Sequence, residues 1–201
     1  MNVKIALAPL AAAALLSACA PQPVPEDLPT IPEALPAMAW DHRPEADEWT
    51  EATLDALQDE GAVLLSTLPA DIGTWCPGFA SAPREDRAAF WSGLFSALAR
   101  FESTWNPRAV GGGGRWFGLV QIDPRTARGY GCEAQSGEAL RDGAANLECA
   151  VRIAARQVAN RGTVSRGMLD WGPFHHDGPR GEIRAWVSQQ DYCQPERTSA
   201  D

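Results

Sequence analysis

An apolar helical stripe that ends in a carboxylate is the feature that most constrains how this chain folds. Four bulky residues recur at the spacing of one helix face, and Glu102 takes the next position on that face; the four are Trp91, Leu94, Phe95 and Leu98. Such a face is normally buried, and an acid is seldom found on it unless it is neutral or functional. The pattern therefore predicts a core helix that turns one carboxyl group inward.

The surroundings of Glu102 predict a raised pKa. The Asn106-Pro107 pair ends the helix just beyond the acid, because proline disfavours the α conformation in the residue before it. Partial burial and the negative end of the helix dipole both disfavour the anion. A Glu that keeps its proton near neutral pH can act as a general acid, so Glu102 is the leading candidate for the centre of the chemistry.

The N-terminus looks like an export signal. Lys4 precedes an apolar run over residues 5–16, which is too short to span a membrane, and small residues stand before Cys19. We interpret residues 1–18 as a lipoprotein signal peptide, with cleavage before Cys19 and lipidation of its thiol. A plain secretory peptide is the alternative. Ala20 favours the outer membrane, so we expect a lipid-anchored protein that faces the periplasm.

The composition then divides the exported chain. Seven prolines lie between Ala20 and Trp49, and seven acidic residues there face a single Arg43, which predicts an extended tether over residues 19–46. Residues 47–75 are expected to form an N-terminal helical extension that breaks at Gly61. Residues 76–193 form the main domain, and residues 194–201 form a flexible tail.

Four cysteines remain besides Cys19, and an even number in an exported domain indicates disulfides. Three pairings are possible. We favour Cys132 with Cys149, and Cys76 with Cys193 closing the ends of the domain. A zinc site made of the four thiolates is the competing interpretation, but no C-x-x-C pair is present, so no metal is expected.

The main domain is expected to be mainly α, because strand patterns are scarce. Ser81, Asp123 and Asp142 are predicted helix caps, the last for a helix that runs to about residue 160, and a short helix is expected over residues 182–188. Residues 76–193 contain 14 Arg against 12 acids, so no basic excess points to nucleic acid. The run His175-His176-Asp177 is not expected to bind metal, since adjacent side chains rarely converge.

From Glu102 onward the chain carries an ordered set of short motifs. They are Glu102-Ser103, Asn106-Pro107, Gly118-Leu119-Val120-Gln121-Ile122, Thr126-Ala127 and Tyr130-Gly131. Here the chain resembles the lytic transglycosylase SLT-domain family, which has the lysozyme-like fold of goose-type lysozyme. The resemblance spans about residues 76–193, and Val120 replaces a methionine of the family pattern.

The resemblance implies an enzyme that cleaves the β-1,4 bond between MurNAc and GlcNAc in the glycan strands of peptidoglycan, with no cofactor. Glycoside cleavage usually needs two carboxylates, whereas this family works with one. Glu102 would protonate the glycosidic oxygen, the acetamido oxygen of the substrate would stabilise the sugar cation, and Glu102 would then act as a base while a 1,6-anhydro ring closes.

The same match suggests the neighbours of the acid. Ser103 would lie near the acetamido group, and Gln121 would line the cleft; a helix-end hydroxyl and a structural amide are their plain alternatives. Trp105 and Trp116, on either side of a glycine run, could stack on sugar rings or be core residues. Tyr130 is counted among the substrate-binding candidates. Asp123 is better explained as a helix cap than as a second catalytic carboxylate.

One position departs from the family pattern. Many members carry a late tyrosine whose hydroxyl bonds the catalytic Glu, whereas this chain has Trp171 in that region. Trp171 could complete a divergent active site, or the cleft could bind glycan with little turnover. Two further functions therefore stay open: a non-catalytic lysozyme-fold lipoprotein that binds peptidoglycan or envelope machinery, and a hydrolytic muramidase in which Asp123 holds a water.

Overall fold

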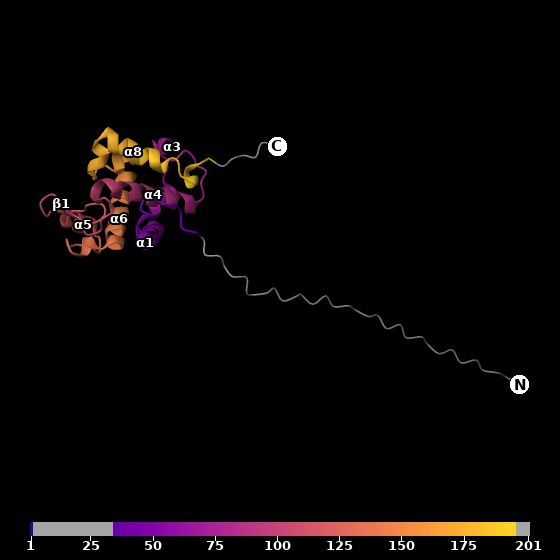
Figure 1. The fold of residues 1–201 in the computed structure, drawn as a ribbon. Helices are drawn as coiled ribbons and strands as arrows, with labels where there is room; N and C mark the ends of the chain where they lie inside the picture. The colour runs from indigo at the N-terminus through magenta and orange to yellow at the C-terminus, as the bar shows by residue number, and fades with distance from the viewer. Residues whose placement is uncertain (2–33, 196–201) are drawn as a thin grey trace. The chain divides into compact units, whose positions relative to one another are not determined.

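The computed structural model describes Met1 and residues 34–195. The signal peptide, Cys19, most of the predicted tether and the tail from residue 196 lie outside the described residues. The described part is mainly helical, as expected, with one two-stranded sheet (Figure 1). Its elements are α1 (Ala46–Gln58), α2 (Ala62–Ser66), α3 (Ile72–Trp75), α4 (Arg84–Ser103), β1 (Val110–Gly111), β2 (Trp116–Phe117), α5 (Pro124–Tyr130), η1 (Ala139–Arg141), α6 (Gly143–Arg161), α7 (Val164–Gly167), η2 (Gly172–His175), α8 (Asp177–Val187) and η3 (Asp191–Cys193).

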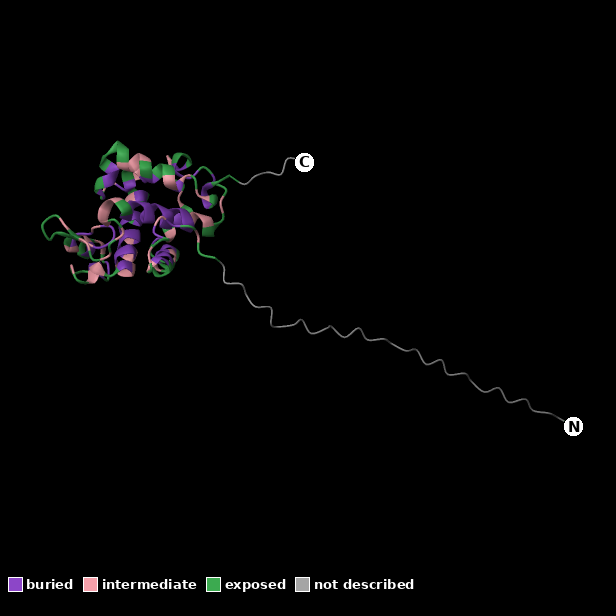
Figure 2. Ribbon diagram, viewed as in Figure 1, coloured by how far each residue is buried: buried purple, intermediate pink, exposed green. Residues whose placement is uncertain are grey.

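Helix α4 runs through the middle of the fold. The helices α1 and α8 pack against it, and α1, α2 and α7 pack against α6. All side chains from Ala88 to Ala99 are buried, including the whole predicted stripe (Figure 2). The helix is thus buried all round rather than along one face, which is the mark of a core helix.

Most of the predicted helix ends are confirmed. The Asp123 carboxylate accepts a bond from the Arg125 amide, and that of Asp142 accepts one from the Ala145 amide, so each caps its helix. The Ser81 prediction is wrong, because its hydroxyl donates to the Gly78 carbonyl and α4 begins only at Arg84. The last predicted helix is longer than expected and begins at Asp177.

The folded unit begins at Ala34, earlier than the boundary at residue 47 that composition suggested. Met38 and Trp40 are buried in the core. The Ala39 amide donates to the Ser96 hydroxyl over 3.0 Å, and the Tyr192 hydroxyl donates to the Ala37 carbonyl over 3.3 Å. These contacts join residues far apart in the chain, which local composition does not report.

Both favoured disulfides are present. Cys76 bonds Cys193 and so joins the two ends of the domain, while Cys132 bonds Cys149 and fastens the loop after α5 to α6. Within residues 34–195, no helix is both long and apolar enough to cross a membrane.

Candidate active site

Glu102 lies in the last turn of α4, one turn beyond the fully buried Leu98. Its residue surface is half-buried, and burial raises the pKa of its carboxyl group to about 7. One carboxyl oxygen, Oε1, is closed off from solvent and has no hydrogen-bond partner among the residues that the structure describes. The side chain can therefore hold a proton near neutral pH.

The turn after Glu102 is built from left-handed backbone. Thr104 and Trp105 have φ of 53° and 54°, a conformation that residues other than glycine rarely adopt. The Ser103 hydroxyl donates to the Ala99 carbonyl and accepts from the Asn106 amide, each over 3.2 Å. Ser103 thus has the structural role of a helix-end hydroxyl, and a contact with substrate stays a prediction.

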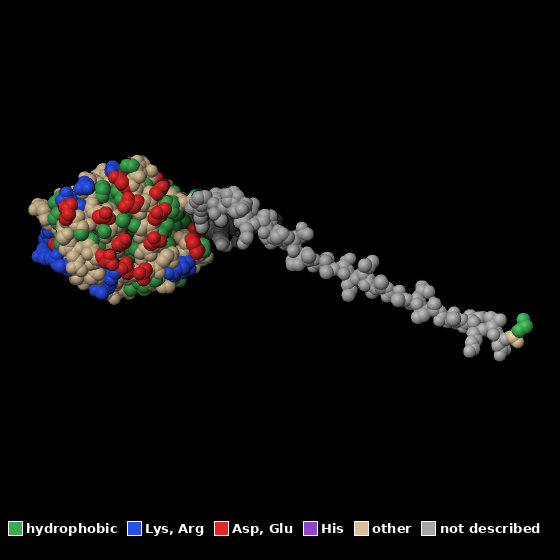
Figure 3. Space-filling view, turned by 90° about the horizontal axis from the view of Figure 1, so that it is seen from below, with side chains coloured by type: hydrophobic (Ala, Val, Ile, Leu, Met, Phe, Trp, Pro, Cys, Tyr) green, Lys and Arg blue, Asp and Glu red, His purple; other side chains and the backbone are tan. Residues whose placement is uncertain are grey.

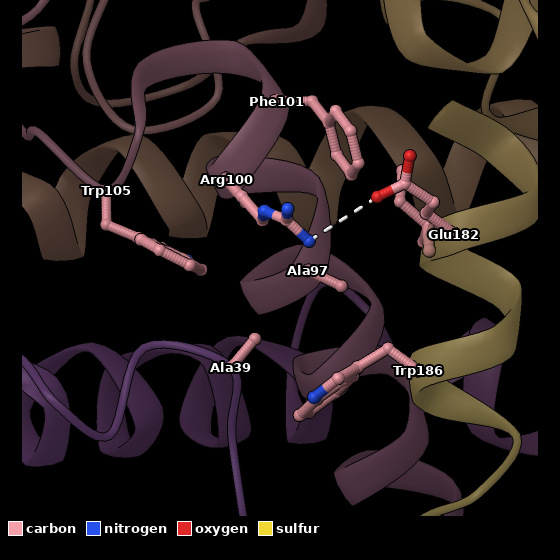
Figure 4. Close-up of a pocket in the computed structure, with 8 residues that line it drawn as sticks. Ala39, Ala97, Arg100, Phe101, Trp105, Glu182 and Trp186 are labelled. Carbon is pink, nitrogen blue, oxygen red and sulfur yellow. Dashed lines mark ion pairs between the residues drawn. The ribbon is translucent and has the colours of Figure 1, made fainter. Parts of the chain in front are cut away.

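The same turn sends Trp105 away from the acid. Its indole N–H donates to the Ser96 carbonyl over 2.9 Å. Ser96 and Glu102 lie about 120° apart around α4, because each residue turns the helix by about 100°. Trp105 instead forms one wall of a cavity of about 110 Å³ that Glu102 does not line; Phe101, Trp186 and the ion pair of Arg100 with Glu182 form other parts of it (Figure 4).

Gln121 ties the loop between β2 and α5 to the hairpin. Its amide nitrogen donates to the Gly118 carbonyl over 2.9 Å and to the Ala109 carbonyl over 3.3 Å. Its backbone is left-handed, with φ of 49°. Its amide oxygen lies beside Gly111, where a Cβ atom would come within 2.2 Å of it. The side chain therefore fixes the loop, whatever it does for a substrate.

Asn146, which the sequence analysis did not single out, holds this loop against α6. The fully buried Asn146 of α6 accepts from the Val120 amide over 2.9 Å and donates to the carbonyls of Phe117 and Leu140 over 3.0 Å. Gly118, with φ of 85°, passes so close that a Cβ atom would lie 2.1 Å from the Leu140 carbonyl oxygen. Asn146 shares its helix face with the buried Ala150 and Ile153, and an amide on such an apolar face was the signal available in the sequence.

Trp116 stands on the hairpin formed by the two strands. The strands pair antiparallel, with Gly111 opposite Trp116. The Trp116 residue is 41 % exposed, and its ring lies over Gly112. The Arg115 guanidinium lies 5.5 Å from the ring centroid. An exposed, supported indole of this kind can stack on a sugar ring.

Residues 80–168 match the family model described as "Transglycosylase SLT domain". Residues 80–168 form a transglycosylase SLT domain. The matched segment includes α4 with Glu102, the hairpin, the Gln121 loop and Tyr130.

Solved structures of one protein, Bd0314 DslA, share this fold. Its wild-type form 2 superposes with a TM-score of 0.73 at 25 % identity, over 81 % of this chain and 100 % of that chain. Two variants in which a glutamate is replaced by glutamine superpose with TM-scores of 0.72 and 0.73 at the same identity and coverage. Among curated proteins, none matches the chain. The predicted lysozyme-like, mainly α fold is therefore confirmed.

The equivalence of Trp171 with the late tyrosine of the family pattern stays a prediction, since Trp171 lies beyond the matched residues 80–168. Trp171 is 4 % exposed, and its indole N–H donates to the Val120 carbonyl over 2.9 Å. Its ring packs edge-on against Phe95, at 6.1 Å between centroids. Trp171 is thus an apolar wall that holds the Gln121 loop, and its one donor is already used.

Each of the two tyrosines of the chain bonds a group other than Glu102. Tyr192 bonds the Ala37 carbonyl, and the Tyr130 hydroxyl lies 3.3 Å from an Asp170 carboxylate oxygen. The Gln157 amide donates both to Tyr130 and to Asp170, and burial raises the pKa of Tyr130. Gln157 and Asp170 are further polar partners that sequence motifs did not reveal. Contact of Tyr130 with substrate stays a prediction.

Asp123 is fixed in its capping position. Besides the Arg125 amide, its carboxylate binds the Arg115 and Arg125 side chains over 2.9 and 3.3 Å. These bonds, that of the Arg125 amide foremost, lower its pKa to about 2. The His175-His176-Asp177 run forms no metal cluster: the His175 ring bonds the Leu169 carbonyl and Asp177 pairs with Arg180. Across residues 34–195, no group of three or more His, Cys, Asp or Glu side chains is arranged so that it could hold a metal ion.

Proposed function

We propose that this protein is a lytic transglycosylase, which cleaves the β-1,4 bond between MurNAc and GlcNAc and leaves a 1,6-anhydroMurNAc end. One observation carries the proposal: in an SLT domain, burial raises the pKa of the Glu102 carboxyl group to about 7. A general acid near neutral pH needs a proton that is retained in this way.

The chemistry uses Glu102 twice. Its proton passes to the bridging oxygen as the bond from that oxygen to C1 of MurNAc breaks, and the acetamido oxygen of the substrate stabilises the cationic sugar. The Glu102 carboxylate then takes the proton of the C6 hydroxyl, whose oxygen bonds to C1. No water is consumed, and the acid ends as it began. Acid catalysis of this kind contributes roughly 10² to 10⁴ in rate.

The surroundings of Asp123 favour this lyase over a hydrolytic muramidase. A hydrolase needs a second carboxylate that holds a water. The Asp123 carboxylate instead accepts hydrogen bonds from the Arg125 amide and from the Arg115 and Arg125 guanidinium groups. A carboxylate with a pKa of about 2 that is already bonded in this way is a poor base.

We further propose that the enzyme works in the periplasm, held by a lipid on Cys19 and sorted to the outer membrane. The support is the sequence alone: a single Lys4 ahead of a short apolar run, small residues before Cys19, and Ala20 after it. Mass spectrometry of the membrane-extracted protein tests this. A lipid-modified Cys19 at the N-terminus is expected, and an unmodified chain that begins elsewhere would contradict it.

Digestion of purified sacculi tests the proposed reaction. The products are identified by mass spectrometry: anhydro ends support the lyase, reducing ends indicate a hydrolase, and bound but undigested glycan indicates a binding protein. Glu102→Gln should abolish release. The matched control is Glu138→Gln, which removes a carboxylate whose side chain is 77 % exposed in a surface pair with Arg141. An equally active Glu102→Gln protein would refute the assignment of the acid.

A further inference from the structure

The lobe that carries the hairpin is basic in an otherwise acidic protein. The full chain has a formal net charge of −9. Residues 106–131 contain four arginines, at positions 108, 115, 125 and 128, and one acid, Asp123. In Figure 3 the Lys and Arg side chains gather at the left end of the molecule, where Figure 1 shows the hairpin, and the acidic side chains gather over the middle. An anionic partner would therefore meet this lobe first.

Two of these arginines form a prearranged pair. The Arg115 Nε and Arg125 Nη2 atoms both bind Oδ2 of Asp123, over 2.9 and 3.3 Å. The two side chains are nevertheless 58 % and 70 % exposed. One anion shared by two cations leaves a net charge of +1, and each planar guanidinium group has further N–H donors to offer.

The pair lines a shallow hollow of about 400 Å³. Asp123 itself also lines the hollow, and Gly114, Phe117, Pro124 and Gly137 complete the lining. The Phe117 ring packs directly on Gly137, where a Cβ atom would come within 2.6 Å of it. The floor of the hollow is thus apolar and closely packed, and the Arg115 and Arg125 guanidinium groups stand at its edge. This arrangement suits a short peptide with a carboxylate.

Trp116 and Phe117 lie on opposite faces of the hairpin. Successive residues of a strand point to opposite faces. Trp116 shares its face with Gly111, which lies against Gln121, whereas Phe117 points to the other face and lines the hollow together with the Arg115 side chain. The Trp116 indole thus stands beside the Gln121 loop, and the Arg115 guanidinium, 5.5 Å from the centre of that indole, connects it with the hollow that Phe117 lines.

We infer that this hollow binds a carboxylate of the peptide stems that peptidoglycan glycan strands carry. The inference rests on the proposed function and adds a second recognition element to it. A glycan strand combines neutral sugar rings with anionic stems, and the Trp116 indole and the hollow match these two chemistries. A net charge of +1 suits a single carboxylate, which a guanidinium group binds through two parallel N–H bonds.

Binding to soluble strands tests the inference without turnover. All proteins carry Glu102→Gln, and the probes are strands with intact stems and strands from which an amidase has removed the stems, leaving only lactyl carboxylates. Calorimetry should show about tenfold tighter binding of the stem-bearing strands, a preference that falls at high salt because exposed charges are screened. Arg115→Gln/Arg125→Gln should abolish the preference and leave the affinity for stripped strands unchanged.

The control is Arg184→Gln, which removes an exposed arginine of α8 and should keep the preference. Circular dichroism melts check that the double variant is folded, and the single Arg115→Gln variant should lose part of the preference. A double variant that still prefers stem-bearing strands overturns the inference. So does equal binding of both strands that falls equally in the double variant, since the lactyl carboxylate would then be the ligand. Anhydro products from the wild-type protein in either case would leave the proposed function standing.

Discussion

Replacing Glu102 by glutamine should make the folded protein more resistant to denaturant above neutral pH, although it removes the catalytic group. The folded-state pKa of Glu102 is about 7, whereas the ordinary value is 4.5. The folded chain therefore binds this proton more tightly than the unfolded chain does. The stability that comes from the protonated carboxyl is complete below pH 4.5 and is lost as the pH rises through 7.

The magnitude follows from the difference of 2.5 pKa units between 4.5 and 7. At about 1.4 kcal/mol per unit, the wild-type protein loses about 3 kcal/mol of unfolding free energy between acidic and mildly alkaline pH through this one group. The Glu102→Gln protein does not lose this unfolding free energy, because glutamine has no charge to desolvate. The free-energy difference between variant and wild type should grow by about 1 kcal/mol up to pH 5 and by about 3 kcal/mol up to pH 8.

Urea unfolding followed by tryptophan fluorescence measures this difference, since five of the eight tryptophans are buried. The readout is the change of the difference with pH, because any fixed effect of the amide cancels. Glu138→Gln, at an exposed carboxylate, should show no such pH dependence. A Glu102→Gln curve parallel to that of the wild type between pH 5 and 8 would refute the claim that this carboxyl is desolvated.

Three other predictions concern the surroundings of the acid. Asn146→Ala removes three buried hydrogen bonds and should cost about 2 to 4 kcal/mol in urea unfolding; a loss below 1 kcal/mol would show that the loop is held otherwise. Trp116→Ala should weaken glycan binding with little change in melting temperature, whereas Trp105→Ala should lower the melting temperature with little change in glycan binding. Equal effects of the two variants on both quantities would contradict these different roles of the two indoles. Replacing the Cys76–Cys193 pair by serine should cost about 5 kcal/mol and the Cys132–Cys149 pair about 3, since the bridges close 117 and 17 residues; a reversed order of unfolding midpoints would contradict this.

Local sequence signals predicted much of the fold and the centre of the site. Helix caps such as Asp123 and Asp142 depend on residues two or three positions away, so pattern reading finds them. Glu102 was found because an acid on an apolar face is anomalous within a single helix turn. The compartment and the even count of cysteines predicted disulfides but left three pairings possible, and the structure contains the favoured one.

The rest of the site depends on contacts between distant segments. Trp105 sits next to the acid in sequence, yet two left-handed residues turn it back along α4 toward Ser96. Asn146 reaches the Val120 amide across 26 positions, and Met38 becomes a core residue only because helices from elsewhere cover it. Motif order alone contains no information about such directions.

Polar side chains near the site have partners that only the fold reveals. The Trp171 indole bonds the Val120 carbonyl, and the Tyr130 hydroxyl bonds Asp170. Burial is the cause of the raised pKa of Glu102. This makes its protonation state the central quantity of the account.

The most direct test of the account is the titration of Glu102 itself by carbon NMR of the side-chain carboxyl, assigned by comparison with the Glu102→Gln protein. We predict a midpoint near pH 7. A midpoint near 4.5 would show an ordinary solvated carboxylate, which could not hold the proton that the proposed reaction delivers.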